Sequence, residues 1–131
     1  MILLDTHVWI WWINNPDYLP DKVQHIIHQH KSQNSIAVSF FSIWEFCMLV
    51  QKQRLHLSED VKDWIARTEK LPYVTFVPIS RDILIQSVYL DDYPHKDPAD
   101  RIILATAMNL NAALITKDHR LQDYQHVETI W

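Results

Sequence analysis

The feature that most constrains the fold of this chain is its alternation of short, continuously apolar runs with longer segments of helical periodicity. Residues 2–4, 36–38 and 113–115 are apolar at every position. Strands that are half-exposed alternate apolar and polar side chains, whereas strands buried on both faces do not. The pattern therefore predicts a mainly parallel sheet covered by helices on both faces, which is a three-layer α/β sandwich.

The expected elements follow from periodicity and from turn and capping residues. We expect strands over residues 2–4, 36–39, 74–77, 113–116 and 127–130. We expect helices over residues 6–13, 20–31, 42–52 and 80–90. A further helix is expected to begin at a cap at Ser58, and another to run from Asp97 to about 109. A helical turn is expected over 118–121. No repeat or linker interrupts the 131 residues, so the sequence predicts a single domain over 1–131.

Composition excludes several functional classes. The chain contains no glycine, so a glycine-rich phosphate-binding loop is impossible. Its net charge of −4 gives no overall basic field for nucleic acid. Cys47 is the single cysteine, which excludes an internal disulfide and fits a reducing compartment. The apolar run 8–13 is too short to cross a bilayer, so we expect a cytoplasmic protein without membrane attachment.

The stretch 95–101 combines a helix start with an unusual amount of charge. Asp97 suits the N-cap, Pro98 suits the first helical position, and Asp100 then falls at the third. Capping alone explains this stretch when it is taken by itself, since acids stabilise helix N-termini.

Three other acids occupy comparable places. Asp5 ends the first strand, and Thr6 is available to cap the helix that follows it. Glu45 stands three residues after Ser42, which is the spacing of a capping box. Asp118 comes two residues after the strand that ends at Thr116. Because the carboxyl ends of parallel strands share one edge of a sheet, we expect these acids and Asp100 to converge there.

Four converging carboxylates repel one another unless a cation neutralises them. An all-oxygen ligand set favours Mg²⁺ or Mn²⁺ over Zn²⁺. Such an ion is suited to activating water and to stabilising charge on a phosphate. Basic residues beside the acids could hold a phosphodiester backbone, with solvated surface charge as the alternative: Lys96, Arg101, Lys117 and Arg120.

Four segments, residues 3–8, 39–45, 95–101 and 114–118, together resemble the PIN-domain ribonucleases, and within them the VapC-like toxins of toxin–antitoxin pairs. They occur in the family's order and extend over nearly the whole chain. The resemblance implies strand order 3-2-1-4-5, RNA cleavage dependent on Mg²⁺ or Mn²⁺, a homodimer, and an antitoxin that blocks the site. The family's acidic quartet corresponds to Asp5, Glu45, Asp100 and Asp118.

Under this hypothesis each residue has an expected role. Asp5 and Asp100 ligate the metal directly, Asp118 directly or through water, and Glu45 through water or by orienting the nucleophile. Supporting roles fall to Thr6, Asp97, Thr116 and Arg101, and we expect Arg101 to pair with an acid or to contact phosphate. RNA contacts fall to Lys96, Lys117 and Arg120.

One position departs from the family pattern. Gln53 stands where the family usually has glycine after the helix that carries the glutamate, so we expect that helix to end differently.

Two other functions remain open. A non-catalytic domain that binds RNA or protein would require a broken quartet, which is intact here. A metal-dependent nuclease that acts on DNA would carry the same residues, so the sequence does not separate it from a ribonuclease.

Overall fold

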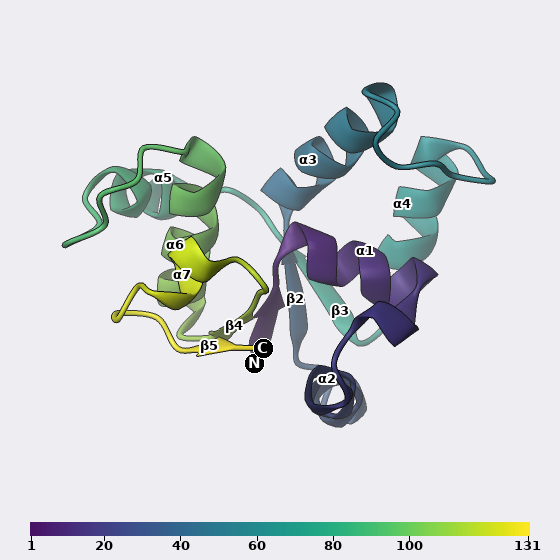
Figure 1. The fold of residues 1–131 in the computed structure, drawn as a ribbon, viewed down its shortest axis with the longest axis horizontal. Helices are drawn as coiled ribbons and strands as arrows, with labels where there is room; N and C mark the ends of the chain where they lie inside the picture. The colour runs from purple at the N-terminus through teal and green to yellow at the C-terminus, as the bar shows by residue number, and fades with distance from the viewer.

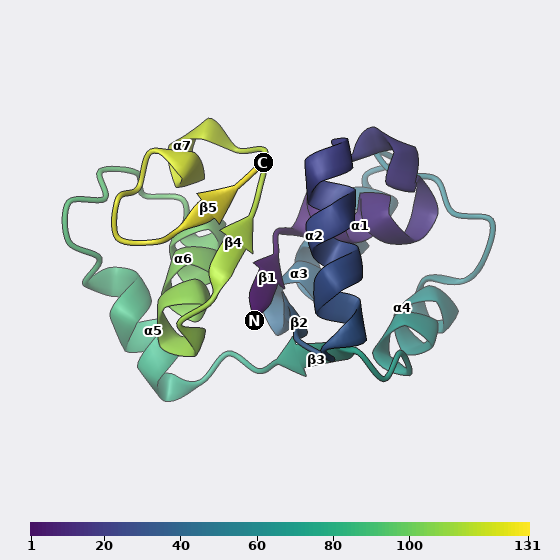
Figure 2. The same ribbon diagram turned by 90° about the horizontal axis from the view of Figure 1, so that it is seen from below.

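The computed structural model describes residues 1–131 and contains one five-stranded sheet. Its strands are β1 (Ile2–Leu4), β2 (Ile36–Ser39), β3 (Val74–Val77), β4 (Ala113–Ile115) and β5 (Thr129–Ile130). Every pairing is parallel and the order is β3-β2-β1-β4-β5, and the strands can be followed in Figure 2. The predicted parallel α/β fold and its strand order are confirmed.

Helices cover both faces of the sheet (Figure 1). One layer contains α1 (Thr6–Asn14), α2 (Asp21–Ser32), α3 (Phe40–Gln51) and α4 (Val61–Glu69), with a short 3₁₀ turn over Pro16–Tyr18. The other layer contains α5 (Arg81–Val88), α6 (Pro98–Leu110) and α7 (His119–Gln122). None of these helices has the length and apolar content needed to span a membrane.

The sheet separates two hydrophobic cores. Ile2 and Leu4 of β1 contribute to the core beneath α1–α4, whereas Leu3 between them contributes to the core beneath α5–α7. Successive side chains of a strand point to opposite faces, so both faces of β1 are buried. This explains why its sequence is apolar at every position.

Aromatic packing fixes the first helical layer. The rings of Phe46 and Trp64 stack with centroids 4.2 Å apart, and Trp9 meets Trp64 edge-on at 5.0 Å. Aromatic pairs of this kind contribute about 0.5–1.5 kcal/mol beyond their burial. They hold α1, α3 and α4 together beside β1.

Two predicted boundaries away from the carboxyl edge of the sheet are wrong for identifiable reasons. The cap of α4 is Asp60, whose carboxylate accepts from the Lys62 N–H at 2.8 Å, and not Ser58. The last strand is shorter than expected, because Val127 is buried in the second core while only Thr129 and Ile130 pair with β4.

The lack of glycine leaves four other residues in the left-handed region of backbone space. Three of them, Asn34, Asp92 and Asn111, are residue types that tolerate positive φ. The fourth is Gln53, which has φ 60° immediately after the C-cap of α3. The expectation that α3 ends differently without glycine is therefore wrong, and Gln53 bears the conformational cost instead.

Candidate active site

Asp5 lies at the junction of β1 and α1, where it is held from two sides. Its Oδ1 accepts a hydrogen bond from the Thr6 N–H at 2.8 Å, so Asp5 is itself the N-cap of α1. Its Oδ2 accepts from the Thr116 hydroxyl at 2.7 Å. The expectation that Thr6 caps this helix is wrong, because α1 begins at the residue directly after Asp5.

Glu45 reaches the site from the second turn of α3. The helix begins at Phe40 with Ser39 as its cap, two residues earlier than expected, so the predicted capping box is absent. Glu45 instead accepts from the buried Thr6 hydroxyl, with Thr6 Oγ1 and Glu45 Oε1 2.6 Å apart.

The hydroxyl of Thr6 also lies 2.8 Å from the hydroxyl of Ser42. A hydroxyl has one hydrogen to donate. Since Thr6 donates to the carboxylate of Glu45, Ser42 is placed to donate to Thr6. This buried chain connects the starts of α1 and α3 and orients Glu45.

Asp100 lies where the sequence predicted. Asp97 caps α6 by accepting from the Ala99 N–H at 2.8 Å, Pro98 is the first helical residue, and Asp100 is in the first turn. The hydroxyl of Tyr93 donates to Asp100 Oδ2 at 3.4 Å.

Asp118 is connected to Asp5 through one side chain. The Thr116 hydroxyl, which donates to Asp5, also accepts from the Asp118 N–H at 3.0 Å. Asp118 Oδ1 caps α7 by accepting from the Arg120 N–H at 2.8 Å. Thr116 is fully buried, so this connection does not depend on solvent.

The electrostatics of the acids show that they share one region. The pKa of Glu45 is raised to about 7, chiefly by burial and then by the charges of Asp5, Asp100 and Asp97. The hydrogen bond from Thr6 offsets part of this increase. Burial and then the charges of Asp97, Asp118 and Asp5 raise the pKa of Asp100 to about 6. Burial also raises the pKa of Asp5. The four predicted acids are therefore brought close enough to oppose one another's ionisation.

The donor set suits a hard divalent cation that keeps water ligands. Glu45, Asp100 and Asp118 each accept a hydrogen bond at only one carboxylate oxygen, which leaves the other available. No three carboxylate, imidazole or thiol groups lie close enough to ligate one ion together in this arrangement. Mg²⁺ usually keeps several waters and takes few carboxylates, so the residues fit such an ion, with water completing its shell.

The basic residues near the acids do different things. Arg101 forms no ion pair with an acid. Its guanidinium donates to the backbone carbonyls of His95 at 2.7 Å, Tyr93 at 2.9 Å and Ser87 at 3.1 Å, so it ties residues 87–95 to α6. The suggestion that Arg101 pairs with an acid is wrong, because these carbonyls occupy its N–H groups.

Three basic residues remain available to a ligand. Lys96, Lys117 and Arg120 are exposed. The ammonium of Lys117 lies 5.6 Å from the ring centroid of Trp11 in α1, within cation–π distance.

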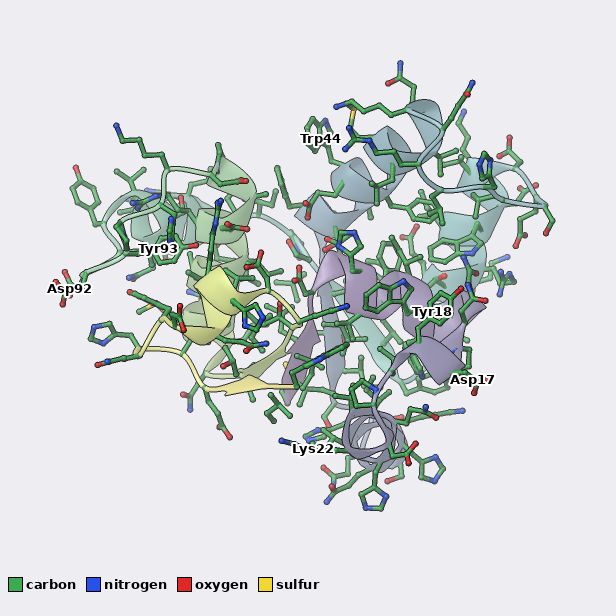
Figure 3. All side chains as sticks on the ribbon, viewed as in Figure 1. Asp17, Tyr18, Lys22, Trp44, Asp92 and Tyr93 are labelled. Atoms are coloured by element: carbon green, nitrogen blue, oxygen red, sulfur yellow. The ribbon has the colours of Figure 1, made fainter.

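Sequence reasoning missed two contributors to the site. Tyr93, labelled in Figure 3, reaches Asp100 from a loop, and no local pattern indicates this. The sequence predicts a capping role for Ser42, whereas it lies buried within α3 beside Thr6.

A parallel sheet in this order, with acids from four segments at its carboxyl edge, defines the class of α/β domain that the sequence resemblance implied. The chain belongs to the PIN domain family, whose sequence model matches residues 2–127.

Individual relatives agree with this membership. The chain is 33% identical to Ribonuclease VapC22 of Mycobacterium tuberculosis, over 99% of this chain and 98% of the relative. Its fold is similar to VapBC2 from Rickettsia felis, a structure bound to a promoter DNA fragment, with a TM-score of 0.75, 18% identity, and 99% and 98% of the two chains covered. It is also similar to FitAcB from Neisseria gonorrhoeae, with a TM-score of 0.68, 19% identity, and 100% and 97% covered.

Proposed function

We propose that residues 1–131 form one nuclease domain that cleaves RNA phosphodiesters with the help of Mg²⁺ or Mn²⁺. The observation that carries this proposal is the group of acids at the sheet edge, which hydrogen bonds of Thr6 and Thr116 hold in place and whose burial and mutual repulsion favour a bound cation. Two further facts support it: a full-length relative is a ribonuclease, and dependence on a divalent metal is a general property of this family.

In this proposal Asp5 and Asp100 would hold the ion directly and Asp118 would hold it through water, because no three of these groups lie close enough to ligate one ion together. The ion supplies positive charge that promotes ionisation of water and stabilises negative charge on the phosphate. Thr116 positions both Asp5 and Asp118 through its hydroxyl. Asp97 fixes the register of α6, and with it the place of Asp100.

Glu45 has a separate role. Thr6 holds one of its oxygens, and its pKa of about 7 suits a group that accepts a proton from water near neutral pH. In-line attack by that water leaves a 5′-phosphate and a 3′-hydroxyl. Lys96, Lys117 and Arg120 contact the phosphates on either side of the cleaved bond.

We further propose that the protein is the toxin of a toxin–antitoxin pair, acts as a homodimer and is inhibited by a cognate antitoxin. The similarity of the fold to a toxin–antitoxin complex from Klebsiella pneumoniae supports this assignment, with a TM-score of 0.66 and 21% identity. A small reading frame immediately upstream, encoding a basic and hydrophobic tail, is the expected companion.

The decisive experiment compares the wild type with Asp5→Asn on total RNA, in Mn²⁺ and in EDTA. Asparagine is also a good N-cap, so it should keep the contact to Thr6 and the fold while weakening the metal site. We expect cleavage by the wild type in Mn²⁺ only, and no cleavage by the variant. Full activity of Asp5→Asn would refute the assignment, and cleavage of DNA in preference to RNA would change the substrate.

A further inference from the structure

An exposed aromatic side chain stands directly beside the candidate active site. Trp44 precedes Glu45 in α3, and 57% of its surface is exposed. Figure 3 shows Trp44 projecting from α3 on the side that faces α6. Exposing a large indole is unfavourable in water, so its position calls for an explanation.

The ring of Trp44 is held in place by its neighbour one helical turn earlier. Phe41 and Trp44 are stacked, with centroids 5.4 Å apart and an interplanar angle of 28°. A ring that is supported on one side and exposed to solvent elsewhere is a preorganised surface for another flat group. Ordering it therefore costs little when a ligand binds.

Glu45 and Trp44 share one hollow of about 150 Å³ with basic side chains. Met48 and Lys52 follow Trp44 at intervals of four residues, so all three lie on one face of α3. Arg54 and His7 complete this part of the wall. Aromatic, apolar and cationic groups therefore adjoin the acid edge on the α3 side.

We propose that Trp44 stacks on an unpaired base of the RNA substrate beside the scissile phosphate, and that Lys52 and Arg54 bind the neighbouring phosphates. This inference rests on the proposed function. Charge complementarity selects the occupant, because an aromatic ring flanked by basic side chains, here Lys52 and Arg54, is how proteins hold single-stranded nucleic acid. A base in a duplex presents no free face, so the site selects unpaired RNA.

The test uses Trp44→Leu and Trp44→Phe with a fluorescein-labelled single-stranded RNA of mixed sequence and with the same RNA annealed to its complement. Binding is measured by anisotropy in EDTA, where the RNA stays intact. Losing one stacked base should weaken binding of the single strand by roughly tenfold or more. Trp44→Phe should restore most of it, because phenylalanine keeps an aromatic face.

Two control variants match these changes. Tyr89→Leu removes an aromatic that is 74% exposed near α5 and should bind RNA as the wild type does. Lys52→Gln should reduce the slope of log K against log salt by about 0.7, as expected for one phosphate contact to a single strand. Lys62→Gln, on α4, should leave that slope unchanged.

Cleavage kinetics separate this inference from the proposed function. In Mn²⁺, Trp44→Leu should raise KM with little change in kcat, because stacking contributes equally to the ground state and the transition state. If the wild type fails to cleave RNA, the proposed function is wrong, while the binding data still decide the role of Trp44.

Three results would overturn the inference. Trp44→Leu could bind single-stranded RNA as tightly as Tyr89→Leu does, or the wild type could bind the duplex as tightly as the single strand. The third is that Trp44→Leu keeps RNA binding and instead abolishes self-association in sedimentation, which would make Trp44 a protein contact.

Discussion

Glu45 should make the stability of the metal-free protein depend on pH. Folding raises the pKa of Glu45 from 4.5 to about 7, chiefly through burial and then through the charges of Asp5 and Asp100. Between these two values the folded protein binds more protons than the unfolded chain does. The free energy of unfolding must therefore fall as the pH rises through this interval.

The size of the effect follows from the shift. At about 1.4 kcal/mol per pKa unit, the shift of Glu45 sets a ceiling of about 3 kcal/mol. Because the side chain is only partly buried, solvent screening reduces this contribution, and we expect a loss of about 1–2 kcal/mol.

The assay is urea denaturation in EDTA at about pH 4.5 and about pH 7.5, followed by circular dichroism. Glu45→Gln cannot titrate, so its stability should fall less than that of the wild type, by about 1–2 kcal/mol. Glu69→Gln is the matched control, because Glu69 is exposed at the end of α4, away from the site. If Glu45→Gln and the wild type lose the same stability over this interval, the electrostatic account of the site is wrong.

Two further predictions concern the backbone around the site. Gln53→Gly should raise the free energy of unfolding by about 0.5–1 kcal/mol in urea, because Gln53 holds φ 60° and glycine adopts this without a steric cost; an unchanged or lower value would contradict this. Arg101→Lys should lower it by about 2–4 kcal/mol and increase hydrogen exchange over residues 87–95, because one ammonium cannot replace a guanidinium bound to several carbonyls. A stable Arg101→Lys protein with weakened RNA binding would instead make Arg101 a phosphate contact.

The layers of the fold were predictable because a strand that is buried on both faces has a continuously apolar sequence. Leu3 and Leu4 are both apolar because they contribute to opposite cores, and this gives a parallel sheet without any knowledge of long-range contacts. The strand order came from the resemblance to a family, since short apolar runs do not specify their neighbours.

The first residue of a helix was predictable only where the sequence offered a single candidate for the N-cap. Asp97 followed by Pro98 left one choice for α6, and the structure confirms it. At α3, Ser39 and Ser42 were both acceptable caps. What decides between them is the contact of Ser42 with Thr6, which is 36 residues away and invisible to local reasoning.

The direction in which a long side chain points could not be predicted from the sequence either. Arg101 follows Asp100 in sequence, which suggested an ion pair or a phosphate contact. In the structure its N–H groups donate to carbonyls at the end of α5 and in the loop that precedes α6. The exposure of Trp44 next to the buried Phe46 likewise depends on which face of α3 meets the core.

The acids are carried by two helical layers whose cores are separate. Glu45 comes from α3, packed over one face of the sheet, and Asp100 comes from α6, packed over the other. The position of each helix on its own face of the sheet therefore sets the spacing of the two carboxylates where α3 and α6 meet. If these acids hold a metal ion as proposed, repacking either core would change the spacing of its ligands while every acid keeps its identity.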